Sequence, residues 1–112
     1  MDRRLLGTMG ENLAADYLQG KGYRIVKRNY RCCYGEIDII AERDGDMAFV
    51  EVKTRSSFQF GRPCEVIDEK KKQHIRKTAH CFLDELKEKR QRPRRYGFHV
   101  MEIVIEHTEN AF

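Results

Sequence analysis

The sequence predicts an α/β fold in which a mixed central sheet is flanked by helices. Two segments, about residues 8–19 and 68–89, carry apolar side chains at helical spacing. Three strand-like segments lie between them and one follows the second helix, so the chain forms a meander and then returns through a helix to a further strand. A length of 112 residues indicates a single domain, residues 1–112, with residues 106–112 as a frayed tail.

The first helix is expected from Thr8 to Gln19, where Gly20 and Gly22 end it. Its apolar stripe consists of Leu6, Met9, Leu13, Ala14, Tyr17 and Leu18. A strand is expected next, from Tyr23 to Asn29.

The second and third strands form a hairpin around Asp44-Gly45, a dipeptide typical of two-residue turns. Counting outward from this turn pairs Ile39 with Val50, Asp38 with Glu51, and Glu36 with Lys53. Alternation along the strands then sorts the side chains onto two faces. The apolar face holds Ile37, Ile39, Ala41, Ala48, Val50 and Val52, and the charged face holds Glu36, Asp38, Glu51, Lys53 and Arg55.

A loop is expected over Phe58–Pro63, and the second helix follows from Asp68 to Lys89. The apolar face of this helix consists of Ile75, Thr78, Ala79, Phe82, Leu83 and Leu86. A basic connector, Arg90–Arg95, leads to a last strand from Phe98 to Ile105.

The charged face of the hairpin predicts a metal site. Directly opposed residues lie about 5 Å apart at Cβ, so Asp38 and Glu51 repel each other unless a positive charge lies between them. Mg²⁺ or Mn²⁺ suits such oxygen ligands. Lys53 points the same way and could orient a water molecule or stabilise a phosphate oxygen. The alternative is a solvated face whose carboxylates pair with lysine and arginine.

The net charge of +4 is unevenly distributed, because basic side chains gather in two places. They are Lys70, Lys71, Lys72, Arg76 and Lys77 in the second helix, and Lys87, Lys89, Arg90, Arg92, Arg94 and Arg95 after it. Such clusters suit a phosphate backbone. The alternative is a solvated helix face and a charged loop.

Several function classes are disfavoured by composition. No apolar run approaches the roughly 20 residues that span a bilayer, so no membrane partner is expected. The N-terminal segment lacks the apolar region of a secretory signal. Cys32, Cys33, Cys64 and Cys81 do not have the spacing of zinc ligands. These features indicate a cytoplasmic protein with reduced thiols.

Short motifs along nearly the whole chain match a known family. They are Gly10-Glu11 with Ala14, Tyr17-Leu18, Gly22-Tyr23, Arg28-Asn29, Gly35-Glu36-Ile37-Asp38, the segment from Phe49 to Arg55, Phe60-Gly61, and the pattern from Lys71 and Lys72 to Ala79. On these residues the chain resembles the YraN-like family (UPF0102), small uncharacterised bacterial proteins of the PD-(D/E)xK nuclease-like superfamily.

The resemblance implies a restriction-endonuclease-like core similar to that of Holliday-junction resolvases. By this likeness Asp38, Glu51, the Val52 carbonyl and Glu11 hold Mg²⁺ or Mn²⁺, and Lys53 completes the catalytic group. A glutamate at the position of Glu11 is also favoured by the helix dipole alone. His99 stands where such proteins commonly have an acidic residue, which puts any supporting role of that position in doubt.

Together these observations predict a metal-dependent DNA endonuclease or phosphodiesterase. The predicted DNA contacts are Arg55, Lys71, Lys72, Arg76, Arg94 and Arg95. Branched DNA follows by analogy only, and cutting both strands of a junction would favour a homodimer. One alternative is a non-catalytic nucleic-acid-binding module that retains the fold. Another is a protein-interaction component whose basic clusters only solvate it.

Overall fold

The computed structural model describes residues 3–56 and 67–112. Its elements are α1 (Arg3–Gly20), β1 (Arg24–Cys32), β2 (Gly35–Arg43), β3 (Asp46–Arg55), α2 (Glu69–Glu88) and β4 (Arg95–Val104). The sheet order is β1-β2-β3-β4, with antiparallel pairs except for the parallel β3–β4 pair. The predicted α/β fold class is confirmed, whereas the predicted loop Phe58–Pro63 lies outside the described residues.

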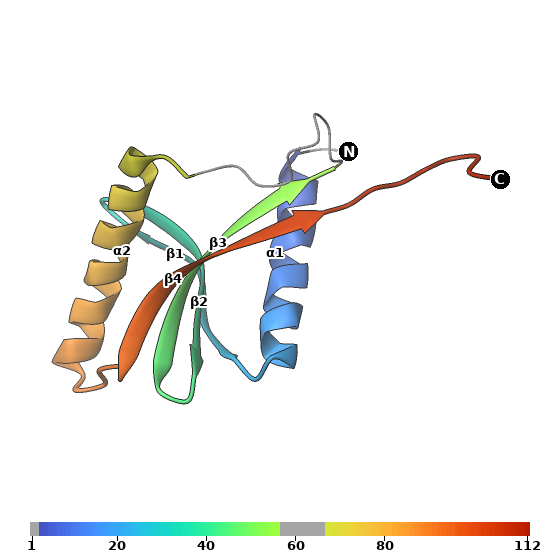
Figure 1. Cartoon of the computed structure of the whole chain (residues 1–112). Coiled ribbons are helices and arrows are strands. Elements are labelled where there is room, and N and C mark those ends of the chain that lie inside the picture. The colour runs from blue at the N-terminus through green and yellow to red at the C-terminus, as the bar shows by residue number, and fades with distance from the viewer. Residues whose placement is uncertain (1–2, 57–66) are drawn as a thin grey trace.

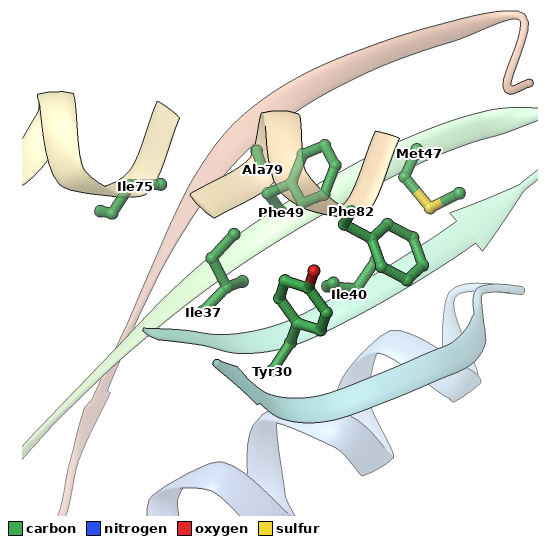
Figure 2. Packing of buried hydrophobic residues seen from close by; sticks show 8 residues of the cluster. All are labelled: Tyr30, Ile37, Ile40, Met47, Phe49, Ile75, Ala79 and Phe82. Carbon is green, nitrogen blue, oxygen red and sulfur yellow. The ribbon is translucent and has the colours of Figure 1, made fainter. Parts of the chain in front are cut away.

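The two helices cover opposite faces of the sheet (Figure 1). Under α2, the core consists of Tyr30, Ile37, Ile40, Met47, Phe49, Ile75, Ala79 and Phe82. Figure 2 shows the Phe82 ring of α2 beside Tyr30 of β1, and the two ring centroids are 5.2 Å apart. Under α1, the core consists of Ala14, Ala15, Leu18, Ile39, Ala41, Ala48 and Val50. The sheet is therefore apolar on both faces over much of its length.

The hairpin register is confirmed from Arg43–Asp46 to Ile39–Val50. Asp44 and Gly45 both have positive φ, 53° and 84°, as a type I′ turn requires. The paired ladder ends at Ile39–Val50, so the predicted Asp38–Glu51 and Glu36–Lys53 pairs are not part of it. Beyond that point the Asp38 carboxylate takes the place of a ladder partner, because its Oδ2 accepts the Val52 N–H at 2.7 Å.

Side-chain alternation breaks at Asp38. Ile37 and Ile40 pack in the core under α2, but Ile39, which lies between them, packs under α1. The prediction that Ile37 shares a face with Ile39 is therefore wrong. The backbone is irregular on the neighbouring strand too, because Asn29 of β1 has φ of 53°. Together these features turn Asp38 out of the regular pleat and toward β3.

Three element boundaries differ from the predicted ones. Helix α1 begins at Arg3, before the predicted start at Thr8; Thr8 lies inside the helix, where its hydroxyl donates to the Arg4 carbonyl at 3.0 Å and does not cap the helix. Strand β1 continues past Asn29 to Cys32. Strand β4 begins at Arg95, since the Arg94 N–H donates to the Gly45 carbonyl at 2.7 Å and holds the connector against the hairpin.

Helix α2 matches its prediction closely. Asp68 is the N-cap, and its side chain accepts the Lys71 N–H at 2.7 Å. The buried residues of the helix are Ile75, Thr78, Ala79 and Phe82. This face holds α2 against the sheet and so places its basic first turns beside the middle of β3.

Helix α1 approaches β3 closely at one point. Gly10 is buried, and a Cβ added there would lie 2.8 Å from Thr54 Cβ and 2.9 Å from Thr54 Cγ2. Only glycine permits this contact. Because Glu11 follows Gly10 directly, the contact also holds the Glu11 carboxylate near the sheet.

After β4 the chain has no regular secondary structure, and residues 106–112 are exposed. Figure 1 shows this segment running away from the rest of the molecule. None of the helices in residues 3–56 and 67–112 is both long and apolar enough to cross a membrane.

Candidate functional site

Asp38 lies at the centre of the candidate site. It comes from β2, where the alternation breaks, and the Val52 N–H fixes one of its carboxylate oxygens. This hydrogen bond orients the carboxylate toward β3 and leaves its second oxygen for another partner. Asp38 therefore lies close enough to interact electrostatically with Glu51, Glu11 and Glu36.

Glu51 lies one step beyond the part of β3 that pairs with β2, within the part that pairs with β4, on the side covered by α2. Its side chain is only 15% exposed, and its Oε1 lies 3.7 Å from Lys71 Nζ of α2. Lys53, two residues further along β3, also acts on Glu51 electrostatically. Two lysines from different elements therefore flank this carboxylate.

Glu11 approaches Asp38 from α1. Its Oε1 lies 4.0 Å from an Arg28 guanidinium nitrogen. With the Asn29 amide oriented to satisfy its hydrogen bonds, the side-chain nitrogen donates to Glu11 and to Glu36 at 3.0 Å each. Glu36 also pairs with Arg31 at 3.1 Å. Glu36, whose role the sequence left open, therefore shares a hydrogen-bond donor with Glu11.

The ionised forms of the three central carboxylates, Glu11, Asp38 and Glu51, are disfavoured in the folded protein. Burial raises the pKa of Glu51, and the charge of Asp38 raises it further. Burial also raises the pKa of Asp38. The hydrogen bond from the Val52 N–H lowers that pKa, and the charge of Glu36 raises it. For Glu11 the same two causes, burial followed by the charge of Asp38, raise the pKa. A cation placed among these carboxylates would relieve the burial penalty and the repulsion together.

The donor set suits a hard divalent cation, but the side chains do not close around one as they stand. Within residues 3–56 and 67–112, no three His, Cys, Asp or Glu side chains are gathered closely enough to hold a metal ion. Asp38 and Glu51 offer carboxylate oxygens, which Mg²⁺ and Mn²⁺ prefer, and Mg²⁺ usually keeps several waters. The residues thus fit a site with two protein carboxylates, completed by water and by a small movement of Glu11.

The predicted DNA contacts lie in different settings. Lys71 is drawn into the site by Glu51, and Lys72 pairs with Glu69 at 3.2 Å. Arg55 is largely buried and pairs with Glu102 at 3.3 Å.

The remaining predicted contacts lie on either side of the sheet's centre. Arg76 lines a recess of about 230 Å³ together with Lys72 and Glu51. Arg94 and Arg95 lie at the hairpin end of the sheet, where both pair with Asp46, at 3.3 and 3.0 Å. Arg76 is thus beside Glu51, whereas Arg94 and Arg95 are at the far end of β3.

Sequence reasoning missed two contributors to the site. Lys71 was expected only among the DNA contacts, because nothing in the chain order shows that α2 crosses over Glu51. Asn29 was read only as the end of a strand. Its side chain contacts two carboxylates and its φ is 53°, a conformation that asparagine tolerates better than most residues.

His99 is held by an aromatic contact. Its ring lies edge-on against Tyr23, with 6.5 Å between the ring centroids. The Arg43 guanidinium packs on the same Tyr23 ring, 4.4 Å from the ring centroid.

Comparison with known proteins assigns most of the chain, including the candidate site, to one protein family. The sequence profile described as "Uncharacterised protein family UPF0102" matches residues 10–103. The chain belongs to this family. The UPF0102 match contains the three central carboxylates, both flanking lysines and Asn29.

UPF0102 relatives extend over most of the chain. One from Caldicellulosiruptor bescii is 46% identical over 99% of this chain and 92% of its own length. One from Caldanaerobacter subterraneus is 40% identical over 94% of this chain and 84% of its own. One from Moorella thermoacetica is 48% identical over 74% of this chain and 69% of its own. The UPF0102 resemblance drawn from short motifs is thereby confirmed.

Proposed function

We propose that the protein is a metal-dependent phosphodiesterase that acts on DNA. The observation that carries this proposal is the Asp38–Glu51 arrangement, two half-buried carboxylates on neighbouring strands, each with a raised pKa, beside Lys53 and Lys71. Structural ion pairs seldom place a buried carboxylate where a second acid opposes its ionisation, as Asp38 does for Glu51. Such an arrangement is typical of a cation site.

Asp38 and Glu51 would hold Mg²⁺ or Mn²⁺, with the Val52 carbonyl and Glu11 as further ligands. When bound, the ion supplies a water of lowered pKa and neutralises charge on a phosphate oxygen. The Val52 N–H keeps the Asp38 carboxylate in one orientation. Lys53 would stabilise the phosphate as negative charge develops on it.

Lys71 would change partners when DNA binds. In the structure its ammonium group lies 3.7 Å from Glu51. A cation at Glu51 would compete with this ion pair and release Lys71 for a phosphate oxygen. Lys72 and Arg76, around the adjoining recess, would hold the next phosphates along the strand. Contacts of this kind are salt-dependent and largely independent of sequence.

The test is cleavage of labelled linear and branched DNA in the presence of MgCl₂ or MnCl₂. We expect cutting by the wild type and a loss of at least about 100-fold in Asp38→Asn and Lys53→Met, in line with the loss of one preorganised charge-stabilising group. Asp16→Asn is the matched control, since Asp16 is exposed on α1. Absence of metal-dependent cutting on every substrate would overturn the enzymatic proposal.

Branched DNA and a homodimer form a finer part of the proposal. A single site that cuts one strand would need a second copy, related by twofold symmetry, to cut the opposing strand of a junction. Cutting of a four-way junction in preference to its linear arms, by a species of dimer mass, would support this part. Equal rates on both substrates by a monomer would contradict it and leave the phosphodiesterase proposal intact.

A non-catalytic nucleic-acid-binding module is the second candidate function. The observation in its favour is that no three metal-ligating side chains are gathered together within residues 3–56 and 67–112. In that case DNA binding would be unchanged by EDTA and no cutting would occur. Binding that strengthens with Mg²⁺ and disappears in Asp38→Asn would favour the enzyme instead.

A further inference from the structure

Three cysteines lie near one another at the end of the molecule opposite the hairpin turn. Cys32 ends β1, Cys33 follows it in the β1–β2 turn, and Cys81 comes from the middle of α2. Their placement results from the fold, because the β1–β2 turn packs against α2. For example, a Cβ added at Gly35 would lie 3.4 Å from Thr78 Oγ1.

The sulfur of Cys32 lies in a polar setting. It accepts the Tyr34 N–H at 3.4 Å, and the Gly35 N–H also reaches it. The thiol of Cys81 shares a hydrogen bond with it across the β1–α2 contact. The Thr78 hydroxyl also touches it, although that hydroxyl already donates to the His74 carbonyl at 2.7 Å. The Cys32 sulfur therefore has a backbone donor from the β1–β2 turn and a second thiol beside it.

We propose that Cys32 and Cys81 form a peroxide-sensitive dithiol, in which Cys32 is the reacting thiol and Cys81 the resolving one. Both side chains are partly exposed, so a small oxidant can reach them. Redox-active cysteines commonly combine hydrogen-bond donors at one sulfur with a second thiol in contact.

The two thiols differ in pKa: the reacting thiol, Cys32, has a lowered pKa and the resolving thiol, Cys81, a raised one. Burial raises the pKa of Cys32, but the hydrogen bonds from Tyr34, Cys81 and Gly35 outweigh it and hold the pKa below the ordinary value. The pKa of Cys81 is raised to about 11, first by its hydrogen bond with Cys32 and then by burial. Cys32 is therefore the thiol that ionises first.

The reaction balances with one hydroperoxide molecule. The Cys32 thiolate attacks a peroxide oxygen, the O–O bond breaks, and hydroxide leaves and takes a proton to become water. Cys81 then attacks the sulfenic acid at Cys32, forms the S–S bond and releases a second water. The two thiols lose two electrons and two protons, and hydrogen peroxide is reduced to two waters.

The disulfide would tie the β1–β2 turn to α2. Asp38 lies six residues after Cys32, and Lys71 precedes Cys81 on α2. Oxidation would therefore fix the position of the β1–β2 turn relative to α2, and both segments lead to candidate site residues. The proposal itself concerns thiol chemistry and does not depend on DNA cleavage.

The first experiment is peptide mapping of the full chain after treatment with hydrogen peroxide and blocking of the remaining thiols. We expect two of the four cysteines to lose reactivity and a linked pair of tryptic peptides, residues 32–43 and 78–87, to appear. Cys33 shares the first peptide, so the same map is made with Cys33→Ser, which should keep the link. A link that disappears in Cys33→Ser, or that involves Cys64, would overturn the proposal.

The second experiment begins with the reduced wild type, whose labelling rates do not depend on how well a variant folds, and then uses one variant. Limited iodoacetamide at neutral pH should label Cys32 roughly tenfold faster than its exposed neighbour Cys33, because the thiolate is the reacting form. Cys81→Ser should trap Cys32 as a sulfenic acid that a dimedone probe detects. Equal labelling of Cys32 and Cys33 would contradict the assigned roles.

Discussion

At the scale of single residues, Asp38 departs most from what a stable sheet requires. A half-buried carboxylate in a sheet normally has a cationic partner, but Asp38 accepts a backbone N–H and has acidic neighbours, and the charge of Lys71 offsets burial and these acids only in part. Its charged form is thereby disfavoured in the folded state. In the folded state without metal, this residue reduces stability.

We therefore expect Asp38→Asn to raise the free energy of unfolding at pH 7 without metal, by a few tenths to about 1 kcal/mol. Asparagine keeps an oxygen that can accept the Val52 N–H, and it removes the repulsion of Glu51 and Glu11. Urea unfolding in EDTA measures the effect, with Asp16→Asn as the control that should be neutral. A destabilised Asp38→Asn would show that the carboxylate has a stabilising partner.

The effect of Asp38→Asn on the free energy of unfolding should depend on pH. Because the pKa of Asp38 is raised on folding, the folded state holds its proton more tightly, and stability falls as pH rises from the unfolded to the folded pKa. The advantage of Asp38→Asn should thus be small at acidic pH and grow toward neutrality. Addition of MgCl₂ should reverse it, since only the wild type would gain a bound cation.

At the scale of elements, the packing of α1 on β3 depends on a single glycine. Gly10 lies against the Thr54 side chain, and Glu11 follows it into the site. Replacement of Gly10 would push the helix outward and move Glu11 away from Asp38. Site geometry and helix packing are therefore coupled at this contact.

Gly10→Ala should lower the free energy of unfolding by about 1–3 kcal/mol, the usual effect of an overpacked contact. Gly7→Ala is the matched control, because Gly7 lies in the same helix and has nothing within 4 Å of an added Cβ. That change should be neutral or stabilising by up to about 1 kcal/mol. Urea or thermal unfolding of both variants tests this, and equal effects would refute the close contact.

At the scale of the whole molecule, the sheet and both helices form one body from which the last residues extend. Ile103 packs against the core under α1, and the Ile105 N–H donates to the Arg55 carbonyl at 2.9 Å. From residue 106 onward every side chain is exposed. The folded unit therefore ends near Ile105.

Removal of residues 106–112 should leave the melting temperature within about 2 °C of the full chain, since exposed changes rarely exceed ~0.5 kcal/mol. Removal of residues 103–112 should lower it by more than about 5 °C, because the Ile103 side chain is lost together with the pairing of Ile103 and Val104 to β3 and the Ile105 hydrogen bond. Circular dichroism during heating compares the two. A large loss in the shorter truncation would show that the tail contributes to folding.

Several features could be predicted from the order of residues because their causes are local. The Asp44-Gly45 turn sets which residues of β2 and β3 face each other in the adjoining pairs. The apolar stripe of α2 shows where the helix lies, and Asp68 and Lys89 cap its two ends. For the same reason Asp38 and Glu51 could be placed together. The motifs that carry the family resemblance are likewise read along the chain.

Other features depend on which elements pack together, and no local pattern carries that information. Lys71 reaches Glu51, Asn29 links Glu11 to Glu36, and Cys32 meets Cys81 only because distant segments are brought together in the folded chain. The break in alternation at Asp38 also depends on its neighbours, since the Val52 N–H on β3 draws its carboxylate out of the pleat. The sequence alone determined the hairpin, its register as far as Ile39–Val50, and the placement of Asp38 and Glu51 near the end of that pairing. The tertiary structure decided what surrounds that pair, because burial and contact between distant segments exist only after folding.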